Sequence, residues 1–583
     1  MIIAVALLVC MFVVEVSTAL QESQIIDEAV HIASGASYWL TGDFRMNPEH
    51  PPLIKLIATL PLAIAKVKTF TDNAAWIHWN EWEYGDYFLY NNTLSVQTIL
   101  MLCRIPIMLL SIGLGYLIFK ASSDLFGRWG GVFSVGMYTL DPNIIAHSRY
   151  VTTDLGFTAF AFLSIYCLVK LLQQPSRRNG IVFFVVFFAM SMSKFSSLLF
   201  SLIIVALVFI VRLLHRDNPA VQWHSIRRWL MYSIPLLMLF TWGLYRFDIH
   251  APSNDPRIHQ LYSQRELYLS AHDPQTLPPL ERFVMTTMGD RGQQFGQWLE
   301  RASSLRIPGY AFFRGSLTVI GHNIGGQESY LLGHYGDRGW WYYFPVAFII
   351  KTPFPTLIAL LCITCVGSAL FITARKRQGF VNAIRATPLP IVLYTMTPIL
   401  FLLVSMGSHL NLGWRHIMPM YPFIFVLIGG LVKLPNAHRF AFGVFIPVAL
   451  FSNLAAIQFV AYPNEIGYFN NLIDGNRNAP KYLLDSNLDW GQDLPKLALY
   501  VKKNSIEHLP FAYYGRAVVS YYVRQAIKLP TTTELQNGDQ SKPHGTVAIS
   551  VGELFRKDKA YAWLWPYTPH TVIGSSIYVY FID

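Results

Sequence analysis

The chain has 583 residues, of which 53% are hydrophobic and only 14% are charged, and its mean hydropathy is +0.36. Soluble globular domains carry about 25% charged residues, so this composition excludes an ordinary soluble protein and indicates a polytopic membrane protein. The formal charge of +11 lies largely in short loops between apolar segments, which favours a role in membrane topology over nucleic-acid binding.

Apolar runs long enough to cross a bilayer recur along the chain. A helical span needs about 20 mostly apolar residues, and on this basis we predict an all-α polytopic body with about eleven transmembrane helices. These spans are expected near residues 1–20, 99–119, 129–145, 154–172, 180–193, 197–214, 228–246, 341–373, 388–405, 417–433 and 439–461. The first run ends in Ser17-Thr18-Ala19, which resembles a signal-cleavage site, but no Lys or Arg precedes the run, so we interpret it as a retained helix.

Basic residues are concentrated in alternate connections between these spans. Lys and Arg are retained on the cytoplasmic side of a membrane. The basic set consists of Lys120, Arg128, Arg177, Arg178, Arg212, Arg216, Arg227, Arg228, Arg375, Lys376, Arg377, Arg385, Lys433 and Arg439. The opposite short connections hold little beyond Arg149, Lys194 and Arg415. We therefore expect the loops 21–98 and 248–340 to share the extracytoplasmic face with the tail.

The tail differs in composition from the rest of the chain. Residues 494–503 have the pattern of an amphipathic helix. Segments rich in aromatic and β-branched residues, typical of strands, are 510–514, 546–551 and 577–582. We predict a transmembrane domain over residues 1–462 and a smaller extracytoplasmic α/β domain over residues 463–583. No glycine-rich phosphate-binding loop follows a predicted strand, which argues against an ATP-driven pump and against a transferase supplied directly by a nucleotide sugar.

The expected outer face brings carboxylates and cations to one membrane depth. Asp27-Glu28 follows the first apolar run, and the prolines before Leu53 suit the first turn of an interfacial helix that carries Lys55. Later outer connections contribute Asp141, His147, Arg149, Asp154, His409, Asn411, Arg415 and His416. A carboxylate at this depth can take a proton from an acceptor hydroxyl, and the cations can neutralise a departing phosphate.

Simpler interpretations exist for the charged residues. Asp27-Glu28 is also typical of a solvated loop after a helix. Arg104, one turn into a span, either extends to lipid headgroups or binds a lipid phosphate. Lys351 lies near the outer end of a span, where the cost of a buried charge favours a functional role.

Histidines and aromatic residues on the outer face have simpler interpretations too. His147 and His322 belong to no cluster with the spacing of metal ligands, so no metal site is predicted. The run Trp340-Trp341-Tyr342-Tyr343 fits an interfacial aromatic belt better than a sugar-binding platform.

Several short motifs occur along the chain in a specific order. They are Asp27-Glu28-Ala29-Val30-His31, Ala36-Ser37-Tyr38, His50-Pro51-Pro52-Leu53-Ile54-Lys55, Arg104-Ile105-Pro106, Ala146-His147-Ser148-Arg149, Thr152-Thr153-Asp154, Tyr330-Leu331-Leu332-Gly333, 339–345, Lys351-Thr352-Pro353, 413–422 and 485–494. Together they resemble the protein O-mannosyltransferases and the bacterial phospholipid-carrier-dependent glycosyltransferases of the GT-C superfamily. The resemblance runs through most of the chain.

This resemblance implies an integral membrane glycosyltransferase that moves a sugar from a polyprenyl-phosphate donor to an acceptor on the extracytoplasmic face, with inversion. Family members carry a catalytic acidic residue in the first outer loop, so Asp27 is the expected base and Glu28 is expected to orient it or the acceptor. The other residues expected to bind the donor phosphate or the acceptor are His50, Lys55, Arg104, Asp154, Lys351 and Arg415.

The chain departs from part of this family. It ends in an α/β tail and lacks the inserted β-trefoil-sized loop of the eukaryotic protein O-mannosyltransferases, so a protein, a glycan and a lipid all stay open as the acceptor. Some relatives use a divalent cation and others do not, and the sequence specifies no cofactor. We expect a multi-pass protein of the bacterial plasma membrane rather than of the endoplasmic reticulum.

Two other functions stay open from the sequence. An oligosaccharide ligase or polymerase using a polyprenyl-diphosphate donor would carry an Arg-rich outer loop. Loop 248–340 contains Arg257, Arg265, Arg282, Arg291, Arg301, Arg306, Arg314 and Arg338. A secondary transporter is disfavoured because its paired half-repeats with broken helices are not evident in the sequence.

Overall fold

A computed structural model describes residues 1–214, 223–252, 304–433 and 444–583. Within these ranges six helical segments are long and apolar enough to cross a membrane. They are α1 (Ile2–Ala19), α6 (Val96–Phe126), α9 (Asp154–Gln173), α11 (Ser197–Leu214), α18 (Phe354–Gln378) and Trp414–Lys433, which comprises η3 (Trp414–Met420), α21 (Tyr421–Ile428) and η4 (Gly429–Lys433). The bent pair α19 (Phe380–Ala386) and α20 (Leu389–Ser405) meets at 107° and gives a seventh if it is counted as one span. The chain is therefore a multi-pass membrane protein.

The other predicted spans correspond to helices that are not among these six candidates. These are α7 (Arg128–Thr139), α8 (Pro142–His147), α10 (Arg177–Ser191), α12 (Trp223–Leu244), α17 (Tyr343–Lys351) and α22 (Ile446–Ala461). The predicted span 341–373 is divided between α17 and α18, because Thr352 is extended at φ −67° and ψ 129°. Pro353 follows, and the residue before a proline avoids the helical conformation. Part of the last predicted span, 439–443, lies outside the described residues, and the count of about eleven stays a prediction.

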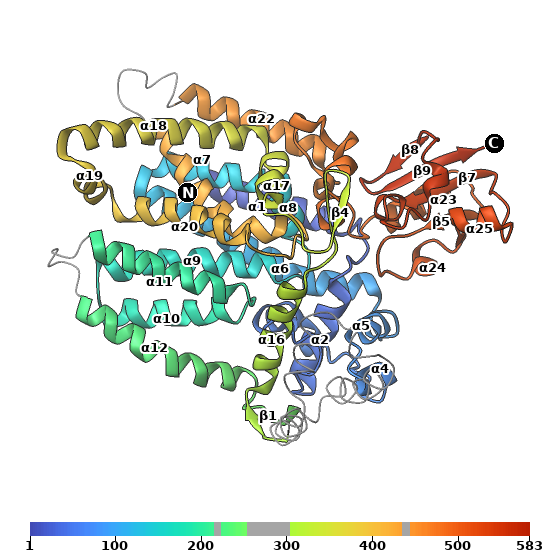
Figure 1. Cartoon of the computed structure of the whole chain (residues 1–583), viewed down its shortest axis with the longest axis horizontal. Helices are drawn as coiled ribbons and strands as arrows, with labels where there is room; N and C mark the ends of the chain where they lie inside the picture. Colours follow the sequence, from blue (N-terminus) through green and yellow to red (C-terminus); the bar gives the residue numbers. More distant parts are fainter. Residues whose placement is uncertain (215–222, 253–303, 434–443) are drawn as a thin grey trace, which may run out of the picture.

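The long helices lie side by side, with their ends gathered at two faces of the molecule. In Figure 1, α9–α12, α18 and α20 run across the view. The C-terminal strands lie at one end, and the turn through α19 lies at the opposite end. Glycines permit the close approach of α1, α6 and α7 in this bundle: a Cβ on Gly115 would lie 2.5 Å from Leu8, and one on Gly131 would lie 2.6 Å from the Phe119 carbonyl oxygen.

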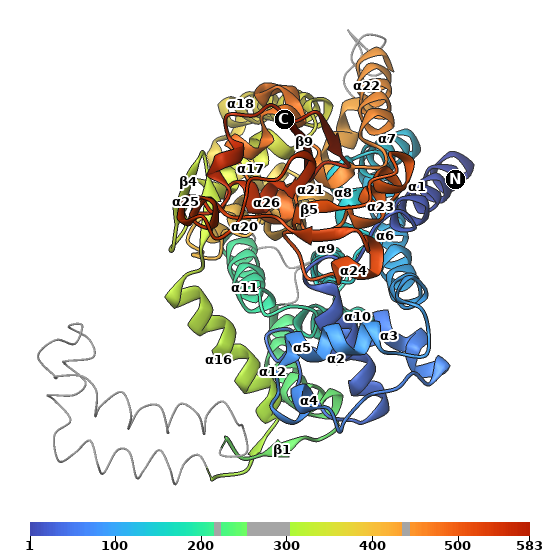
Figure 2. The same ribbon diagram turned by 90° about the vertical axis from the view of Figure 1, so that its right-hand side faces the viewer.

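Short helices cover the end of the bundle that carries the C-terminal strands (Figure 2). They are α2 (Glu28–Leu40), α3 (Leu53–Ala65), α4 (Ala74–Ile77), α5 (Glu81–Tyr90) and α16 (Tyr310–Gly325). Two pairs of short antiparallel strands lie near them: β1 (Ile249–His250) pairs with β2 (Ile307–Pro308), and β3 (Ser329–Leu331) forms a hairpin with β4 (His334–Gly336). Most of the predicted Arg-rich loop, residues 253–303, lies outside the described residues.

The tail begins with five short 3₁₀ turns and continues into a five-stranded mixed sheet of order β6-β5-β7-β9-β8. The turns are η7 (Glu465–Gly467), η8 (Asn471–Ile473), η9 (Gly475–Arg477), η10 (Ala479–Lys481) and η11 (Asp485–Asn487). The strands are β5 (Leu509–Ala512), β6 (Ala526–Lys528), β7 (Gly545–Ser550), β8 (Thr571–Ile573) and β9 (Ile577–Ile582), and the helices are α23 (Leu494–Lys503), α24 (Val519–Tyr522), α25 (Thr532–Asn537) and α26 (Val551–Leu554). The predicted amphipathic helix is therefore confirmed as α23, and the three predicted strands are confirmed as β5, β7 and β9. That this segment forms a separate extracytoplasmic domain stays a prediction.

The tail contacts the short helix α5 and the segment before α2 directly. Arg516 forms an ion pair of 2.6 Å with Asp86 of α5, and the backbone N–H of Val518 donates to the hydroxyl of Tyr90 at 3.0 Å. Closer to the bundle, the backbone N–H groups of Ser23 and Ile26 donate to the carbonyls of Gln492 and Trp490. The segment before α2 is thereby held against the segment before α23.

Candidate functional site

Asp27 lies at the first turn of α2, where it forms an ion pair with Arg415. One guanidinium nitrogen, Nη1 of Arg415, lies 2.7 Å from Oδ2 of Asp27, and the Asp27 side chain is 22% exposed. The backbone contacts between 23–26 and 490–492 set this position, because they carry Asp27 to the start of η3. The predicted base is thus held in place by a cation and is still open to solvent or substrate.

Arg415 connects this carboxylate to a second one. Its Nη1 also lies 3.5 Å from Oδ2 of Asp154, which begins α9, and its guanidinium lies 4.3 Å above the ring of Trp490. The Nε of Arg415 is buried and has no hydrogen-bond partner among the described residues. Gly413 makes the approach of this segment possible, since its φ of 134° suits glycine and a Cβ there would lie 2.4 Å from Oγ of Ser486.

Lys194 completes a chain of charged side chains that runs from the partly exposed Asp27 to the buried Asp154. Its Nζ lies 2.5 Å from Oδ1 of Asp154, whose side chain is only 3% exposed. The sequence placed Lys194 in an outer connection but did not select it as a site residue. With Asp27, Arg415 and Asp154, it forms what we call the charge cluster.

Asp485 adds a third carboxylate beside Arg415. Burial raises the pKa of Asp485 to about 6, the Arg415 cation lowers it and the Asp27 carboxylate raises it. The hydroxyl of Tyr514 donates to Oδ1 of Asp485 at 3.4 Å. Asp485 and Trp490 both belong to the motif 485–494 that contributed to the family resemblance, and that motif was the available signal for them.

Glu28 has a different environment from its neighbour Asp27. Its carboxylate binds Arg104 in two places, Oε1 to Nε at 2.8 Å and Oε2 to Nη2 at 2.6 Å, and both side chains are completely buried. Glu28 also accepts from the backbone N–H groups of Ile25 and Val151, and Arg104 donates to the carbonyls of Ala19 and Ser23. Glu28 and Arg104 therefore bond to each other and to the backbone, and their expected roles in orienting and binding the substrates stay predictions. Contact of Arg104 with lipid headgroups is excluded in this arrangement, because its side chain is completely buried.

The two lysines predicted for donor or acceptor binding also bond to protein groups. Nζ of Lys55 donates to the Tyr38 hydroxyl at 2.8 Å and to the Asn47 carbonyl at 2.8 Å, and burial lowers the pKa of Lys55 to about 7. Nζ of Lys351 donates to the carbonyls of Ile466 and Asn487 at 2.9 and 2.8 Å. Both ammonium groups therefore stabilise backbone segments beside the site, and their expected role as ligands stays a prediction.

His50 lies near the charge cluster with an unused nitrogen. Its ring meets the ring of His31 edge-on at 5.0 Å, and its buried Nδ1 has no partner among the described residues. Burial lowers the pKa of His50 well below its usual value, with the nearby Lys194 adding to the effect. A neutral imidazole with one unused nitrogen is suited to a hydrogen bond with a ligand, so His50 stays a predicted binding residue.

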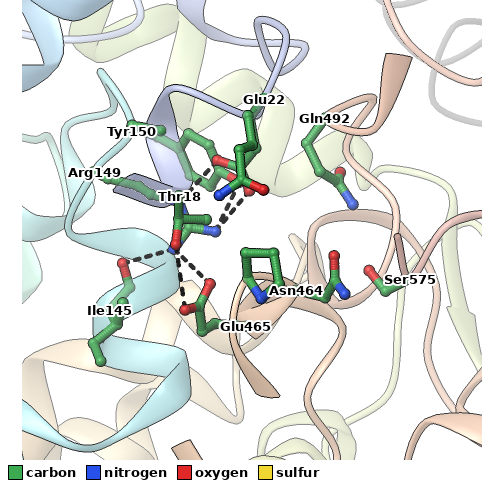
Figure 3. Close-up of polar contacts among 12 residues, drawn as sticks. Thr18, Glu22, Ile145, Arg149, Tyr150, Asn464, Glu465, Gln492 and Ser575 are labelled. Carbon is green, nitrogen blue, oxygen red and sulfur yellow. Dashed lines mark hydrogen bonds and ion pairs between the residues drawn. The ribbon is translucent and has the colours of Figure 1, made fainter. Parts of the chain in front are cut away.

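Arg149 anchors the surrounding backbone through a second buried ion network (Figure 3). It binds Glu22 through Nε and Nη2 at 2.8 and 2.7 Å, and its Nη1 lies 3.3 Å from Glu465. The same Nη1 donates to the Ile145 carbonyl, while Thr18 donates to Glu465. This network joins the end of α1, α8 and the start of the tail, and thereby fixes three segments that border the site.

Among the described residues, no group of three or more His, Cys, Asp or Glu side chains is arranged to hold a metal ion. The carboxylates of Asp27 and Asp154 face Arg415 and Lys194 instead. The use of a divalent cation stays an open prediction.

Residues 96–243, from α6 to α12, match the family model described as dolichyl-phosphate-mannose-protein mannosyltransferase. The resemblance to this GT-C family is confirmed for that segment. It contains Asp154 and Lys194, whereas Asp27 and Arg415 lie outside it. No curated protein matches the chain.

Two kinds of solved structure are similar to the chain at low identity. The crystal structure of ArnT from Cupriavidus metallidurans bound to undecaprenyl phosphate is 11% identical, with 99% of this chain and 97% of that chain covered and a TM-score of 0.43. The crystal structure of the Archaeoglobus fulgidus oligosaccharyltransferase in the apo form is 8% identical, with 79% and 58% covered and a TM-score of 0.44.

Proposed function

We propose that the chain is a membrane glycosyltransferase that moves a sugar from a polyprenyl-phosphate donor to an acceptor on the extracytoplasmic face. The observation that carries this proposal is the charge cluster: a partly exposed carboxylate, Asp27, pairs with Arg415, which is joined through Asp154 to a second cation, Lys194. The family match over residues 96–243 supports the same reaction class.

The transfer can be written with these residues in defined roles. The acceptor hydroxyl attacks the anomeric carbon from the side opposite the phosphate, so the new C–O bond forms as the bond to the phosphate oxygen breaks and the configuration inverts. Asp27 accepts the hydroxyl proton, and the phosphate leaves with the bonding electrons. Arg415, through its unused Nε, and Lys194 stabilise the negative charge on the phosphate.

The distribution of basic residues supports the proposed sidedness. Arg375, Lys376 and Arg377 end α18, and Arg385 lies in α19, at the end of the bundle opposite the C-terminal strands (Figure 1). The charge cluster forms at the other end, where α2 meets the tail. Since basic connections are retained in the cytoplasm, this arrangement favours a site on the extracytoplasmic side.

The first prediction concerns the base. We expect Asp27→Asn to lower the release of polyprenyl monophosphate by about 10²–10⁴-fold, because a general base contributes an effect of that size. Release is measured by lipid mass spectrometry on membrane vesicles supplied with polyprenyl-phosphate hexoses and pentoses. Asp43→Asn is the matched control, since Asp43 lies in the same outer segment and its carboxylate pairs, within the described part of the chain, with Arg45 two positions further on.

Two results would overturn the proposal. One is an Asp27→Asn variant that folds and turns over at the rate of the Asp43→Asn control. The other is a polyprenyl diphosphate as the released lipid, which would identify an oligosaccharide ligase instead. Much of the Arg-rich loop that would favour a ligase lies outside the described residues, so the released lipid is the decisive measurement.

A further inference from the structure

A cavity of about 540 Å³ lies between the β3–β4 hairpin and the C-terminal segment. Its walls include Tyr330, Tyr335, Tyr343, Tyr514 and Asp485. We propose that this cavity binds a neutral saccharide that forms part of the acceptor. The assignment rests on the proposed glycosyl transfer and adds the chemical class of the acceptor to it.

The tyrosine rings are fixed in place before any ligand arrives. The hydroxyl of Tyr330 donates to the Pro480 carbonyl at 2.7 Å, and the hydroxyl of Tyr335 donates to the Phe555 carbonyl at 2.6 Å. The two rings meet edge to face, with centroids 5.0 Å apart. Rigid aromatic faces among a few placed polar groups are typical of small-ligand sites, and they match a sugar, which has apolar C–H faces and hydroxyl edges.

The charges of the cavity favour a neutral occupant. Arg556 pairs with Glu553 at 3.0 Å and with Asp558 at 2.8 Å. Lys557 pairs with Glu328 at 3.2 Å and with Asp337 at 2.9 Å. Both cations of the wall are therefore committed to carboxylates, and an anionic ligand would have to displace them. A basic peptide would also compete with these pairs, whereas a saccharide can donate and accept hydrogen bonds without breaking them.

Asp485 connects the cavity to the charge cluster. It lines the cavity, accepts from Tyr514 and lies close enough to Arg415 and Asp27 for both to shift its pKa. Tyr343, another wall residue, accepts from Asn487 at 3.2 Å, next to the segment that positions Trp414. The cavity is therefore bordered by a carboxylate that interacts electrostatically with both Arg415 and the proposed base, Asp27.

The position of the cavity favours the acceptor over the lipid-linked donor as its ligand. The wall residues come from the β3–β4 region, the start of α17, the loop before η3 and the tail, and none belongs to a candidate membrane span. A polyprenyl donor requires contact with the bilayer. A water-exposed glycan requires no contact with the bilayer, so the cavity suits the acceptor.

Saccharide binding by the purified full-length protein in detergent micelles tests this proposal. The probes are glucose, mannose, galactose, N-acetylglucosamine and their β1,4-linked disaccharides, detected by saturation-transfer NMR. We expect at least one probe to bind with a dissociation constant of about 10 mM or below. Removing a rigid aromatic ring with Tyr335→Ala should weaken binding by about tenfold or more, whereas Tyr335→Phe, which keeps the ring, should bind within about threefold of the parent.

Tyr521→Ala is the matched control, since Tyr521 is an exposed tyrosine of the tail outside the cavity wall and should leave binding unchanged. Failure of every probe to bind, or binding by a folded Tyr335→Ala variant equal to that of Tyr521→Ala, would overturn the proposal. So would salt-sensitive binding of a Lys- and Arg-containing peptide that displaces the saccharide. Saccharide binding should persist in Asp27→Asn, so this test is separate from the test of transfer. Absence of saccharide binding in a protein with normal lipid release would overturn only the cavity assignment.

Discussion

Neighbouring residues in this chain have opposite environments. Asp27 is partly open and pairs with Arg415, while Glu28 is completely buried and pairs with Arg104. Successive residues of a helix project about 100° apart, so two adjacent carboxylates at the start of α2 face different surroundings. Only the first of the pair has a partly exposed carboxylate, as the proposed role of a base requires.

The raised pKa of Asp485 predicts that the stability of the protein depends on pH. Its pKa is raised from 3.8 to about 6, so the folded protein binds this proton more tightly than the unfolded chain does. Stability should therefore fall as the pH rises from about 4 to about 6, and the penalty should be complete above that range. Asp485→Asn removes the penalty and should raise the free energy of unfolding at pH 7.5 by about 1–3 kcal/mol, with little change at pH 4.

The unfolding midpoint of both proteins across pH 4 to 8 measures this difference. Asn is a suitable replacement because Asp485 has a φ of 57°, a left-handed conformation that Asn tolerates. A parent protein whose midpoint rises relative to Asp485→Asn between pH 5 and pH 7 would contradict the expected loss of stability.

Among the elements, α2 and α6 are joined by the Glu28–Arg104 pair. The pair is bidentate, completely buried and extended by backbone contacts on both sides. Breaking such a pair leaves an uncompensated charge in an apolar environment, whereas replacing both partners removes the charge altogether.

This pair predicts strong non-additivity in stability. We expect Arg104→Met to cost about 3–5 kcal/mol, and the double variant Glu28→Gln with Arg104→Met to recover part of that loss. The measurement is the unfolding midpoint of the two single variants and the double variant. Strictly additive losses would show that the two side chains do not act as a unit, and a folded double variant that still transfers sugar would confirm that Glu28 has no catalytic role.

Across the whole molecule, the tail contributes directly to the site in the membrane body. Trp490 is 1% exposed and lies beneath the Arg415 guanidinium, and Asp485 lies beside the same group. The Arg149 network and the backbone pairing of 23–26 with 490–492 hold the tail in this position. The site therefore depends on contacts between segments far apart in the sequence.

Trp490 tests this dependence. We expect Trp490→Ala to destabilise the protein by about 3–5 kcal/mol, as for other buried aromatic truncations, and to lower lipid release because Arg415 loses its support. Trp565→Ala is the control: Trp565 also lies in the tail but is 49% exposed, and its loss should change stability by less than about 0.5 kcal/mol. Parental lipid release by a folded Trp490→Ala protein would show that the tail is not part of the site.

The membrane character, the alternation of basic connections, α23 and three strands of the tail were all predictable from the sequence. Each depends on local hydrophobicity, charge or periodicity over a short stretch. The break at Thr352 was missed in the predicted span 341–373, although Pro353 was the available signal.

The partners of the charged residues were decided only by the tertiary structure. Asp27 and Arg415 are separated by 388 positions, and the Arg104, Lys55 and Lys351 cations are taken up by protein groups that no local pattern specifies. A buried charge must find a partner wherever the packed backbone supplies one. The sequence pattern therefore predicts that cations and carboxylates gather at one end of the bundle, while three-dimensional packing determines which of them pair and which, like Asp27, keep an exposed surface.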